Sequence, residues 1–440
     1  MDYEQRYKLA EWVMDYTLSS GADEVGVDLV RAEELDIEFR DNTIDKLEQG
    51  IQDLLYLEVY RDNRYSAHKS NLLDKKYLID FIDNALNTTM YLEKDLFRTL
   101  PDKTLYPEKA EYDLQLYDNS YSMLNNKDKI SIASNIEKAS LSLSEKVIAS
   151  TSSYSEGCFH LIKMQSNGFR GDKYSTSYSI GAEVTARDDN NDLCEDSYYA
   201  HTRFFNDLPS SEKVGKEAAE RCLKKIGQNK ISSGIYTMVV ENSEASILLG
   251  MILSAMKGSS LFLRSSFLEG MKGKRVASER LTIIDDPYIR KGLRSNYFDS
   301  EGCATQKRVV VDSGILKEYY IDTYYGKKLK MKPTNGERSN ILLEYGANSC
   351  EELFAKAGEG IFITEFIGGN FNSTTGDFSF GIAGFLFEKG RIVQPINEMN
   401  ITGNALRLWN NLIEVGNDPF PYSSVQTPTL VFKEVFFSGD

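Results

Sequence analysis

Histidine, basic charge and long apolar runs are all scarce in this chain of 440 residues. The three histidines, His68, His160 and His201, lie far apart, and no HExxH or HxH pairing occurs. A histidine-rich zinc site within one segment is therefore excluded. Lys and Arg number 51 against 66 Asp and Glu, which gives a net charge of −15. This balance argues against direct binding to nucleic acid or anionic lipid, whose phosphates are held mostly by Lys and Arg.

Signals for membranes, secretion and disulfides are also lacking. The longest uncharged apolar stretch, residues 245–256, is shorter than the roughly 18 residues that a membrane-spanning helix needs. The N-terminus has neither a basic start nor an apolar run, so we expect no secretory signal. The 5 cysteines are scattered without a CxxC pair, which indicates reduced thiols in a core. These features predict a cytoplasmic protein.

The residues that are present predict three α+β segments. Hydrophobic residues make up 41% of the chain, enough for a large core. In residues 1–100, apolar spacing predicts a first helix that stops at Gly21 and a second helix over 74–90. Alternation in residues 35–40 and 55–59 predicts strands. The first segment therefore reads as a small αββα-type domain.

Two further domains follow a polar connection that contains Pro101 and Pro107. Residues 108–230 are predicted to form an α+β domain, with helices over 127–146 and 211–227 around strands in 158–205. Residues 231–440 hold 22 of the 31 glycines, which suggests many tight turns. Hairpins are predicted at 312–314 and 389–390. We expect a large, glycine-rich, mostly antiparallel β domain with peripheral helices.

Residues 376–381 place an Asp between glycines inside an apolar, strand-rich stretch. One interpretation is a turn whose Asp377 accepts backbone N–H bonds. The other is a turn that lines a peptide cleft. Asn404 allows the same two interpretations, because it is also well placed to cap a helix. The candidate cleft residues are Gly376, Asp377, Phe378, Ser379, Gly403 and Asn404.

Several different short motifs follow one another along the third segment. They are 272–274, 285–287, 298–302, Asn340, 375–379, 403–404 and 427–429. Together they resemble the C-terminal domain of the TldD/PmbA family, whose PmbA branch is also called TldE. The resemblance implies a two-subunit metallopeptidase that acts on unfolded or linear peptides. In TldD-type chains, an HExxxH motif and a later cysteine hold the metal.

The metal-binding residues of TldD-type chains have no counterpart at the corresponding positions. Ser246 and Met251 stand where the two histidines would be, and Ile247 stands where the catalytic Glu would be. Residues 418–422, where the cysteine is expected, contain no sulfur. Hydroxyl and thioether groups are poor zinc ligands, and isoleucine cannot act as a base. The apolar run 247–256 instead predicts a buried helix, capped by Asn242 or Ser243.

The resemblance thus implies a metal-free PmbA/TldE-type subunit with no catalytic residue and no cofactor of its own. Its expected partner is a TldD-like chain that carries a zinc-type metal, or a second copy of itself, and its expected substrate is an unfolded peptide. Two alternatives stay open. One is an independent peptidase whose metal is held by carboxylates such as Asp377 and Glu398. The other is a regulatory binding protein, because family members are also called modulators of DNA gyrase.

Overall fold

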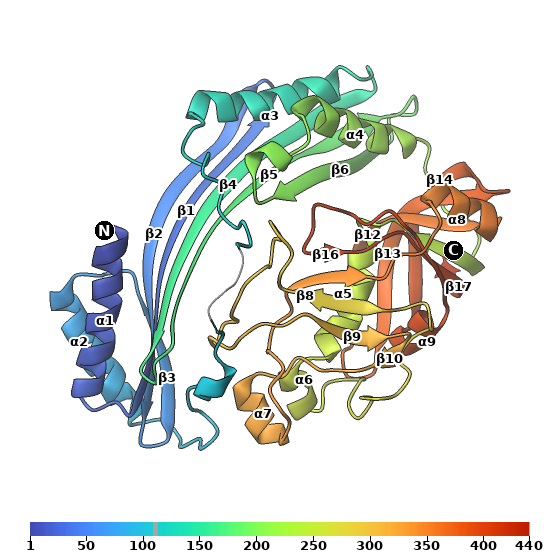
Figure 1. Ribbon diagram of the computed structural model, residues 1–440. Helices are drawn as coiled ribbons and strands as arrows, with labels where there is room; N and C mark the ends of the chain where they lie inside the picture. The colour runs from blue at the N-terminus through green and yellow to red at the C-terminus, as the bar shows by residue number, and fades with distance from the viewer. Residues whose placement is uncertain (109–112, 440) are drawn as a thin grey trace.

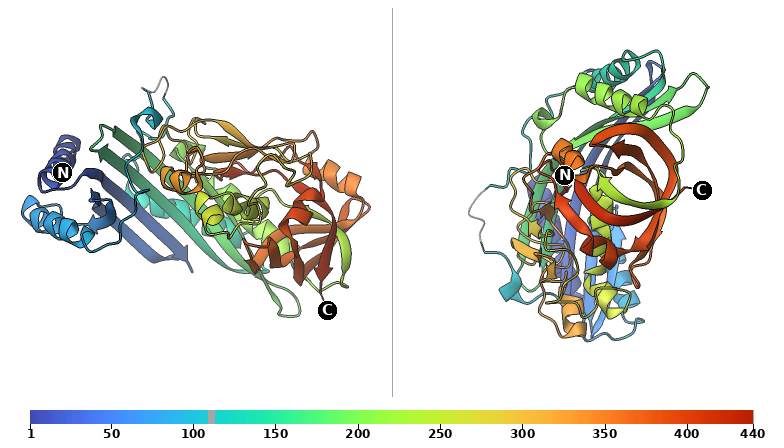
Figure 2. Two further views of the ribbon diagram at one scale, coloured as in Figure 1. Left: turned by 90° about the horizontal axis from the view of Figure 1, so that it is seen from below. Right: turned by 90° about the vertical axis from the view of Figure 1, so that its right-hand side faces the viewer.

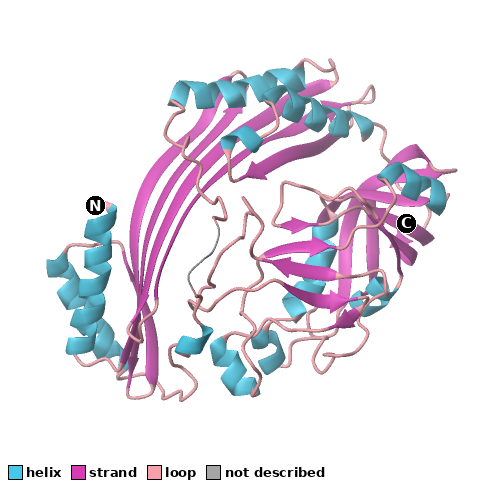
Figure 3. Cartoon of the chain, viewed as in Figure 1, coloured by secondary structure: helices cyan, strands magenta, loops and turns pink. Residues whose placement is uncertain are grey.

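The computed structural model describes residues 1–108 and 113–439. A long, strongly curved sheet wraps around a C-terminal domain that lies on its concave side (Figure 1). Figure 3 shows that helices cover the convex side of this sheet at both of its ends. None of the helices in the described residues combines the length and apolar character that crossing a membrane requires. All five cysteines are free, and four of them are buried.

The curved sheet is antiparallel throughout and joins two segments of the chain. Strand β1 pairs with β4 from Gly26↔Gln165 to Phe39↔Ser152, so residues 1–100 and 108–230 share one sheet. The strand order is β3-β2-β1-β4-β5-β6. The strands are β1 (Glu24–Arg40), β2 (Thr43–Arg61), β3 (Arg64–Ser70), β4 (Val147–Gln165), β5 (Arg170–Arg187) and β6 (Leu193–Thr202).

Two helix pairs cover separate halves of the convex face. Odd-numbered residues of β1 point to this face, since side chains alternate along a strand. Val25, Val27 and Leu29 pack in one core with α1 (Tyr3–Ser19) and α2 (Lys75–Thr89). Leu35, Ile37 and Phe39 pack in a second core with α3 (Asn126–Leu141) and α4 (Ser211–Lys224). The predicted helices are confirmed, although α3 ends five residues before position 146.

The C-terminal domain contains two sheets. In one, β14 pairs with β17 as well as with β13, so the strands close into a ring, seen end-on in the right view of Figure 2. Its strands are β7 (Gly234–Val240), β12 (Gly360–Phe371), β13 (Asp377–Glu388), β14 (Arg391–Asn404), β15 (Leu412–Val415) and β17 (Leu430–Ser438). The second sheet has β8 (Ile283–Asp286), β9 (Arg308–Asp312), β10 (Ile315–Leu316), β11 (Asn340–Leu343) and β16 (Val425–Gln426).

Helix α5 (Ala245–Ala255) packs between the two C-terminal sheets. Leu248 and Ile252 of α5 share a core with Ile283 of β8 and Ile382 of β13. Shorter helices surround the domain: α6 (Gly258–Phe262), α7 (Thr323–Leu329), α8 (Cys350–Ala357) and α9 (Ala405–Asn410). Apart from the parallel pairs β7–β12 and β11–β16, the named strands pair antiparallel. The predicted α+β class, with a mostly antiparallel C-terminal domain and peripheral helices, is confirmed.

Glycine has identifiable roles in this domain. Both predicted hairpins are present, with Gly314 and Gly390 in left-handed conformations at their turns. At Gly384 of β13, a Cβ atom would lie 1.9 Å from the carbonyl oxygen of Phe362 in the neighbouring β12. Only glycine allows the two strands to approach this closely, which accounts for part of the glycine enrichment.

Candidate functional site

Helix α5 carries the positions predicted to correspond to the two metal-binding histidines and the catalytic Glu of a TldD-type chain. Met251 is 3% exposed and belongs to the C-terminal core. The hydroxyl of Ser246 donates to the carbonyl of Ser243 at 3.5 Å. Ile247 is 39% exposed, so the predicted buried helix is confirmed except at this position. A core thioether, a hydroxyl and an alkyl chain do not form a zinc-binding set.

Residues 418–422, far away in sequence, lie against the start of α5. The side-chain amide of Asn242 donates to the carbonyl of Asp418 at 2.6 Å. Thr427 Oγ1 donates to the carbonyl of Asn242 at 2.8 Å. Phe420 is buried and meets the ring of Tyr199 edge-on. The structure thus brings together the two stretches that correspond to the metal site of TldD-type chains, without imidazole or thiol.

The N-terminus of α5 differs from the sequence prediction. Neither Asn242 nor Ser243 caps the helix, because Glu244 is its N-cap residue and makes no side-chain capping bond. Instead, Glu244 Oε2 accepts a hydrogen bond from the backbone N–H of Phe366 at 3.2 Å. Burial raises the pKa of Glu244 to about 7, and the nearby Glu241 adds to this rise.

The six candidate cleft residues come together where β13 begins and β14 ends. Asp377 pairs with Asn404 and Phe378 with Gly403 across the two strands. The carboxylate of Asp377 is exposed and accepts hydrogen bonds from Thr375 Oγ1 at 2.7 Å and Asn404 Nδ2 at 3.0 Å. These bonds hold the pKa of Asp377 below its usual value. The turn is therefore braced by side chains rather than by the backbone N–H bonds of the first interpretation.

Asn404 has a structural role at the same turn. Its side-chain oxygen accepts from the N–H of Leu406 at 3.1 Å and thereby caps α9, while its amide holds Asp377. Glu398, the other carboxylate of the independent-peptidase alternative, has a different partner, since Lys230 Nζ lies 3.2 Å from it. Asp377 and Glu398 thus share no contact. Glu398 lines a cavity of about 630 Å³ together with Lys230, and neither Asp377 nor Glu398 lines the two cavities along α5 described next.

The larger cavity, of about 650 Å³, lies where the curved sheet meets the C-terminal domain. We call it the arginine cavity after Arg98, Arg294 and Arg338, which line it together with Lys257. Glu58 and Tyr60 of β2 contribute the wall from the curved sheet. The opposite wall comes from the C-terminal domain and includes the α5 residues Gly250, Leu253 and Ser254.

The second cavity, of about 540 Å³, lies at the other end of α5, between the middle segment and the C-terminal domain. We call it the glutamate cavity after Glu241, Glu244 and Glu365 in its wall. Phe420 lines it too. Residues 242–244, at the start of α5, and residues 420–422 line this cavity, so the two stretches predicted to correspond to the metal site of a TldD-type chain meet here.

Arg221 in the wall of the glutamate cavity and Lys225, which lies just outside that wall, form one ion-pair network, whereas Lys213 of the wall is exposed and lies outside the network. Arg221 of α4 makes a bidentate contact with Glu241, at 2.7 and 2.8 Å, and donates to Asp196 at 3.1 Å. Lys225 lies 2.9 Å from Asp196 and 2.5 Å from Glu365. Because each of its two cations contacts two carboxylates, the network ties the middle segment to the C-terminal domain.

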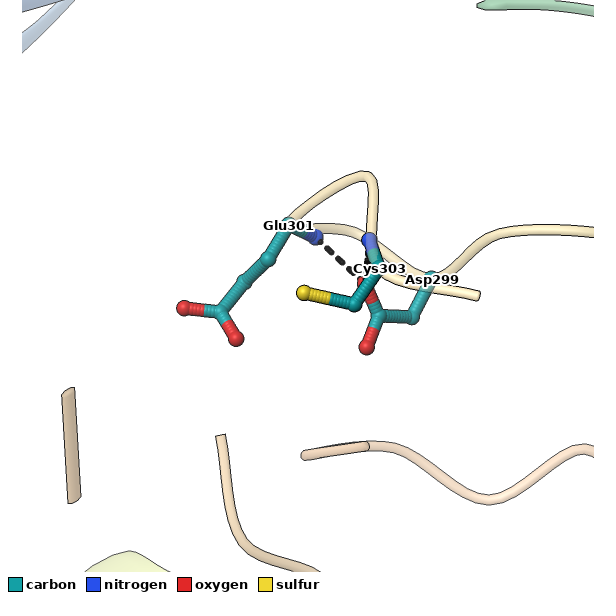
Figure 4. A group of neighbouring side chains, drawn as sticks. All are labelled: Asp299, Glu301 and Cys303. Carbon is teal, nitrogen blue, oxygen red and sulfur yellow. Dashed lines mark hydrogen bonds between the residues drawn. The ribbon is translucent and has the colours of Figure 1, made fainter. Parts of the chain in front are cut away.

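One further group combines metal-binding residue types. Asp299, Glu301 and Cys303 lie within 4.8 Å of one another in one turn of the C-terminal domain (Figure 4). Asp299 Oδ1 accepts from the N–H groups of Glu301 and Cys303, and Glu301 accepts from Thr323. Burial and Asp299 raise the pKa of the Cys303 thiol, which disfavours the thiolate that a metal requires. These hydrogen bonds stabilise the turn and explain why the three side chains lie together.

The three histidines lie in three different strands, and none of them is paired with another across the sheet. His160 of β4 accepts from Arg6 Nη1 at 2.6 Å through Nδ1, which requires a neutral ring. Burial, together with Arg6, lowers the pKa of His160 to about 4. His68 lies in β3 and His201 in β6. The histidines thus supply no base or ligand to either cavity.

Comparison with known proteins agrees with this geometry. Residues 233–439 match the family model of the PmbA/TldA metallopeptidase C-terminal domain, and residues 121–226 match that of the central domain. The metalloprotease PmbA of Escherichia coli O157:H7 is 30% identical over 427 residues, which cover 96% of this chain and 94% of the relative. The chain belongs to the PmbA/TldD family.

Solved structures of similar proteins share the fold along the whole chain. A Bacteroides thetaiotaomicron protein, described as a candidate modulator of DNA gyrase, is 41% identical with a TM-score of 0.97, and the match covers 100% of both chains. TldE from Thermococcus kodakarensis is 19% identical with a TM-score of 0.86 and covers 98% of this chain and 100% of its own. The second match shows the common fold alone. The family resemblance found in the sequence is therefore confirmed.

Proposed function

We propose that this chain is a cytoplasmic PmbA-type subunit without a metal site of its own. It pairs with a TldD-like chain to form a metallopeptidase that degrades or processes unfolded peptides. The observation that carries this proposal is the pairing of α5 with residues 418–422 around Ser246, Ile247 and Met251. In this proposal, a hydroxyl and a core thioether stand in place of two metal ligands, and an alkyl chain stands in place of the catalytic base.

Peptide handling follows from the family membership and from the strand-rich C-terminal domain. An extended peptide can add to a sheet through backbone hydrogen bonds, which select unfolded chains with little sequence preference. In this proposal, Gly376, Asp377, Phe378 and Ser379, with Gly403 and Asn404 opposite, border the shared peptide cleft. Asp377 and Gly403 are exposed and available to a partner or a peptide, whereas Gly376 and Phe378 are buried behind them.

Zinc titration and sedimentation together test this assignment. The purified chain and the TldD-like chain of the same genome are titrated with zinc separately, and their mixture is analysed by sedimentation velocity. We expect stoichiometric zinc uptake by the TldD-like chain, none by this chain, and a heteromeric complex in the mixture. Tight stoichiometric uptake by this chain would favour the independent peptidase instead. If this chain instead formed a stable dimer with itself and no complex with the TldD-like chain, a homodimer would be favoured.

The regulatory alternative makes a different prediction. The net charge of −15 disfavours direct contact with DNA, so a modulator of the gyrase type would act through protein contacts. In that case the chain would bind neither the TldD-like chain nor an unfolded peptide, and it would associate with a folded protein target.

A further inference from the structure

The cations of the arginine cavity lack the partners that such groups normally have. Among residues 1–108 and 113–439, no carboxylate lies within ion-pair distance of Arg98, Lys257, Arg294 or Arg338. Arg98 stacks on the ring of Tyr324 at 3.5 Å, which orients the guanidinium without neutralising it. Arg98 and Arg338 are partly buried, whereas Lys257 and Arg294 are exposed. The wall also contains four carboxylates, Glu58, Glu301, Asp322 and Glu337, and in the described residues none of them forms an ion pair with these cations.

Neighbouring residues increase this positive potential. Lys173 of β5 lies in the field of Arg203 and Arg294, and burial together with these charges lowers its pKa to about 8. Burial and Arg294 likewise lower the pKa of Arg338. Arg203 donates to the backbone carbonyls of Thr176 and Leu293 and contacts no carboxylate. Like charges gathered in this way repel one another, and a bound anion would remove the repulsion.

Carboxylates in the same wall are mostly occupied by their own segments. Glu58 accepts from Tyr65 at 2.8 Å, Glu301 accepts from Thr323 at 2.8 Å, and Asp322 caps α7 by accepting from Tyr325 at 2.6 Å. Glu337 is exposed and raises the pKa of Lys173 from a distance. This mixed wall repels dense polyanions but admits one or two isolated negative charges, which fits a carboxylate better than a nucleotide or a nucleic acid.

We propose that the arginine cavity binds a free carboxylate of a peptide, with Arg294 and Arg338 as its principal ligands and Arg98 at its edge. The group comes from the C-terminus of the peptide or from an Asp or Glu side chain. The inference rests on the proposed role in peptide handling and adds a chemical preference to it. A cavity of about 650 Å³ is in the range that encloses small ligands, so it holds a short stretch of peptide.

Fluorescence anisotropy with four peptides tests this proposal. The peptides share one sequence of uncharged residues and a label at the N-terminus. They combine a free or amidated C-terminus with Glu or Gln at one internal position, which distinguishes the two sources of the carboxylate. We expect at least one carboxylate form to bind the purified chain about tenfold more tightly than the peptide without a carboxylate. Its affinity falls with added salt, because exposed charges are screened.

Variants locate the site. The double variant Arg294→Gln/Arg338→Gln is expected to lose the preference for carboxylate peptides, while Lys at both positions retains part of it. Arg391→Gln is the matched control, since Arg391 is exposed in β14 and lies outside the cavity. If the double variant does not fold, Arg98→Gln and the salt dependence of the wild-type chain provide the test.

Three results would overturn the proposal. They are equal binding of the carboxylate and amide peptides, a preference that persists in the folded double variant, and tighter binding of inorganic phosphate than of any carboxylate peptide. The binding assay uses this chain alone, so it is independent of peptidase activity. A mixture with the TldD-like chain that fails to cleave would contradict the proposed function, yet it would leave the peptide preference measurable.

Discussion

At the glutamate cavity, Arg221 of the wall and the adjoining Lys225 each contact two carboxylates, whereas Arg294 and Arg338 of the arginine cavity contact none in the described residues. Both cavities lie against α5 and both join the curved sheet to the C-terminal domain. A paired network holds two parts of a fold together, while the guanidinium groups of the exposed Arg294 and the partly buried Arg338 stay available to a ligand. The difference indicates a structural role for the first set and a binding role for the second.

The largest effect is expected from breaking the paired network. Arg221→Met leaves Glu241 without its bidentate partner in a largely buried site, and we expect a loss of about 3 kcal/mol in the free energy of unfolding. Urea denaturation measures this loss. Lys216→Met is the matched control on the same helix, because the Lys216–Glu212 pair is exposed, and its midpoint should not change. Equal effects of the two variants would contradict the structural role of the network.

Glu244 of the glutamate cavity makes the stability of the folded chain depend on pH in the acidic range. Its pKa rises from 4.5 to about 7 on folding, so the folded chain binds the proton more tightly than the unfolded chain. Stability therefore decreases as pH rises from about 4.5 to 7, by up to about 3 kcal/mol for this group. Glu244→Gln should flatten that part of the profile of thermal midpoint against pH. An unchanged slope would show that Glu244 is not the titrating group.

Lys173, a neighbour of Arg294, makes the stability of the folded chain depend on pH in the opposite direction at higher pH. Its pKa falls from 10.5 to about 8 on folding, so the unfolded chain binds more protons in this window. Stability should increase as pH rises from about 8 to 10.5, by up to about 3 kcal/mol for this group. The difference between the wild-type profile and that of Lys173→Met isolates the contribution. If the stability of the wild-type chain relative to Lys173→Met fell between pH 8 and 10.5, the lowered pKa of Lys173 would be contradicted.

The smallest effect is expected at Arg338. Arg338→Gln removes a cation that is repelled by Arg294 and has no ion-pair partner, so stability should stay within about 0.5 kcal/mol or rise slightly. Differential scanning calorimetry with and without the carboxylate peptide shows the contrast, because the peptide should stabilise only the wild-type chain. A large loss of stability in the variant without peptide would assign Arg338 a structural role like that of Arg221.

Local sequence patterns predicted most elements and the family. The hairpins at Gly314 and Gly390 are set by the turn residues themselves. The positions of Ser246 and Met251 on a buried helix also followed from periodicity and motif spacing. Such features depend on neighbours in the chain, which a sequence displays directly.

Local sequence patterns did not predict the contacts between residues that are far apart in the chain. The pairing of Gly26 with Gln165 merges the first two predicted segments in one sheet, and no local signal marks it. The division into domains at residues 1–100, 108–230 and 231–440 accordingly stays a prediction. Arg98 and Arg338 meet at one cavity although 240 residues separate them. An unpaired arginine looks the same in sequence as a paired one, so the arginine cavity could not be found before the fold was known.

Peptidase activity on an unfolded polypeptide tests the central claim most directly. The chain alone, the TldD-like chain alone and their mixture are assayed, each with and without a chelator. The account predicts that the mixture cleaves, that the chelator abolishes the cleavage, and that this chain alone is inactive. Cleavage by this chain alone would contradict the account, because Ser246, Ile247 and Met251 supply neither a zinc site nor a base.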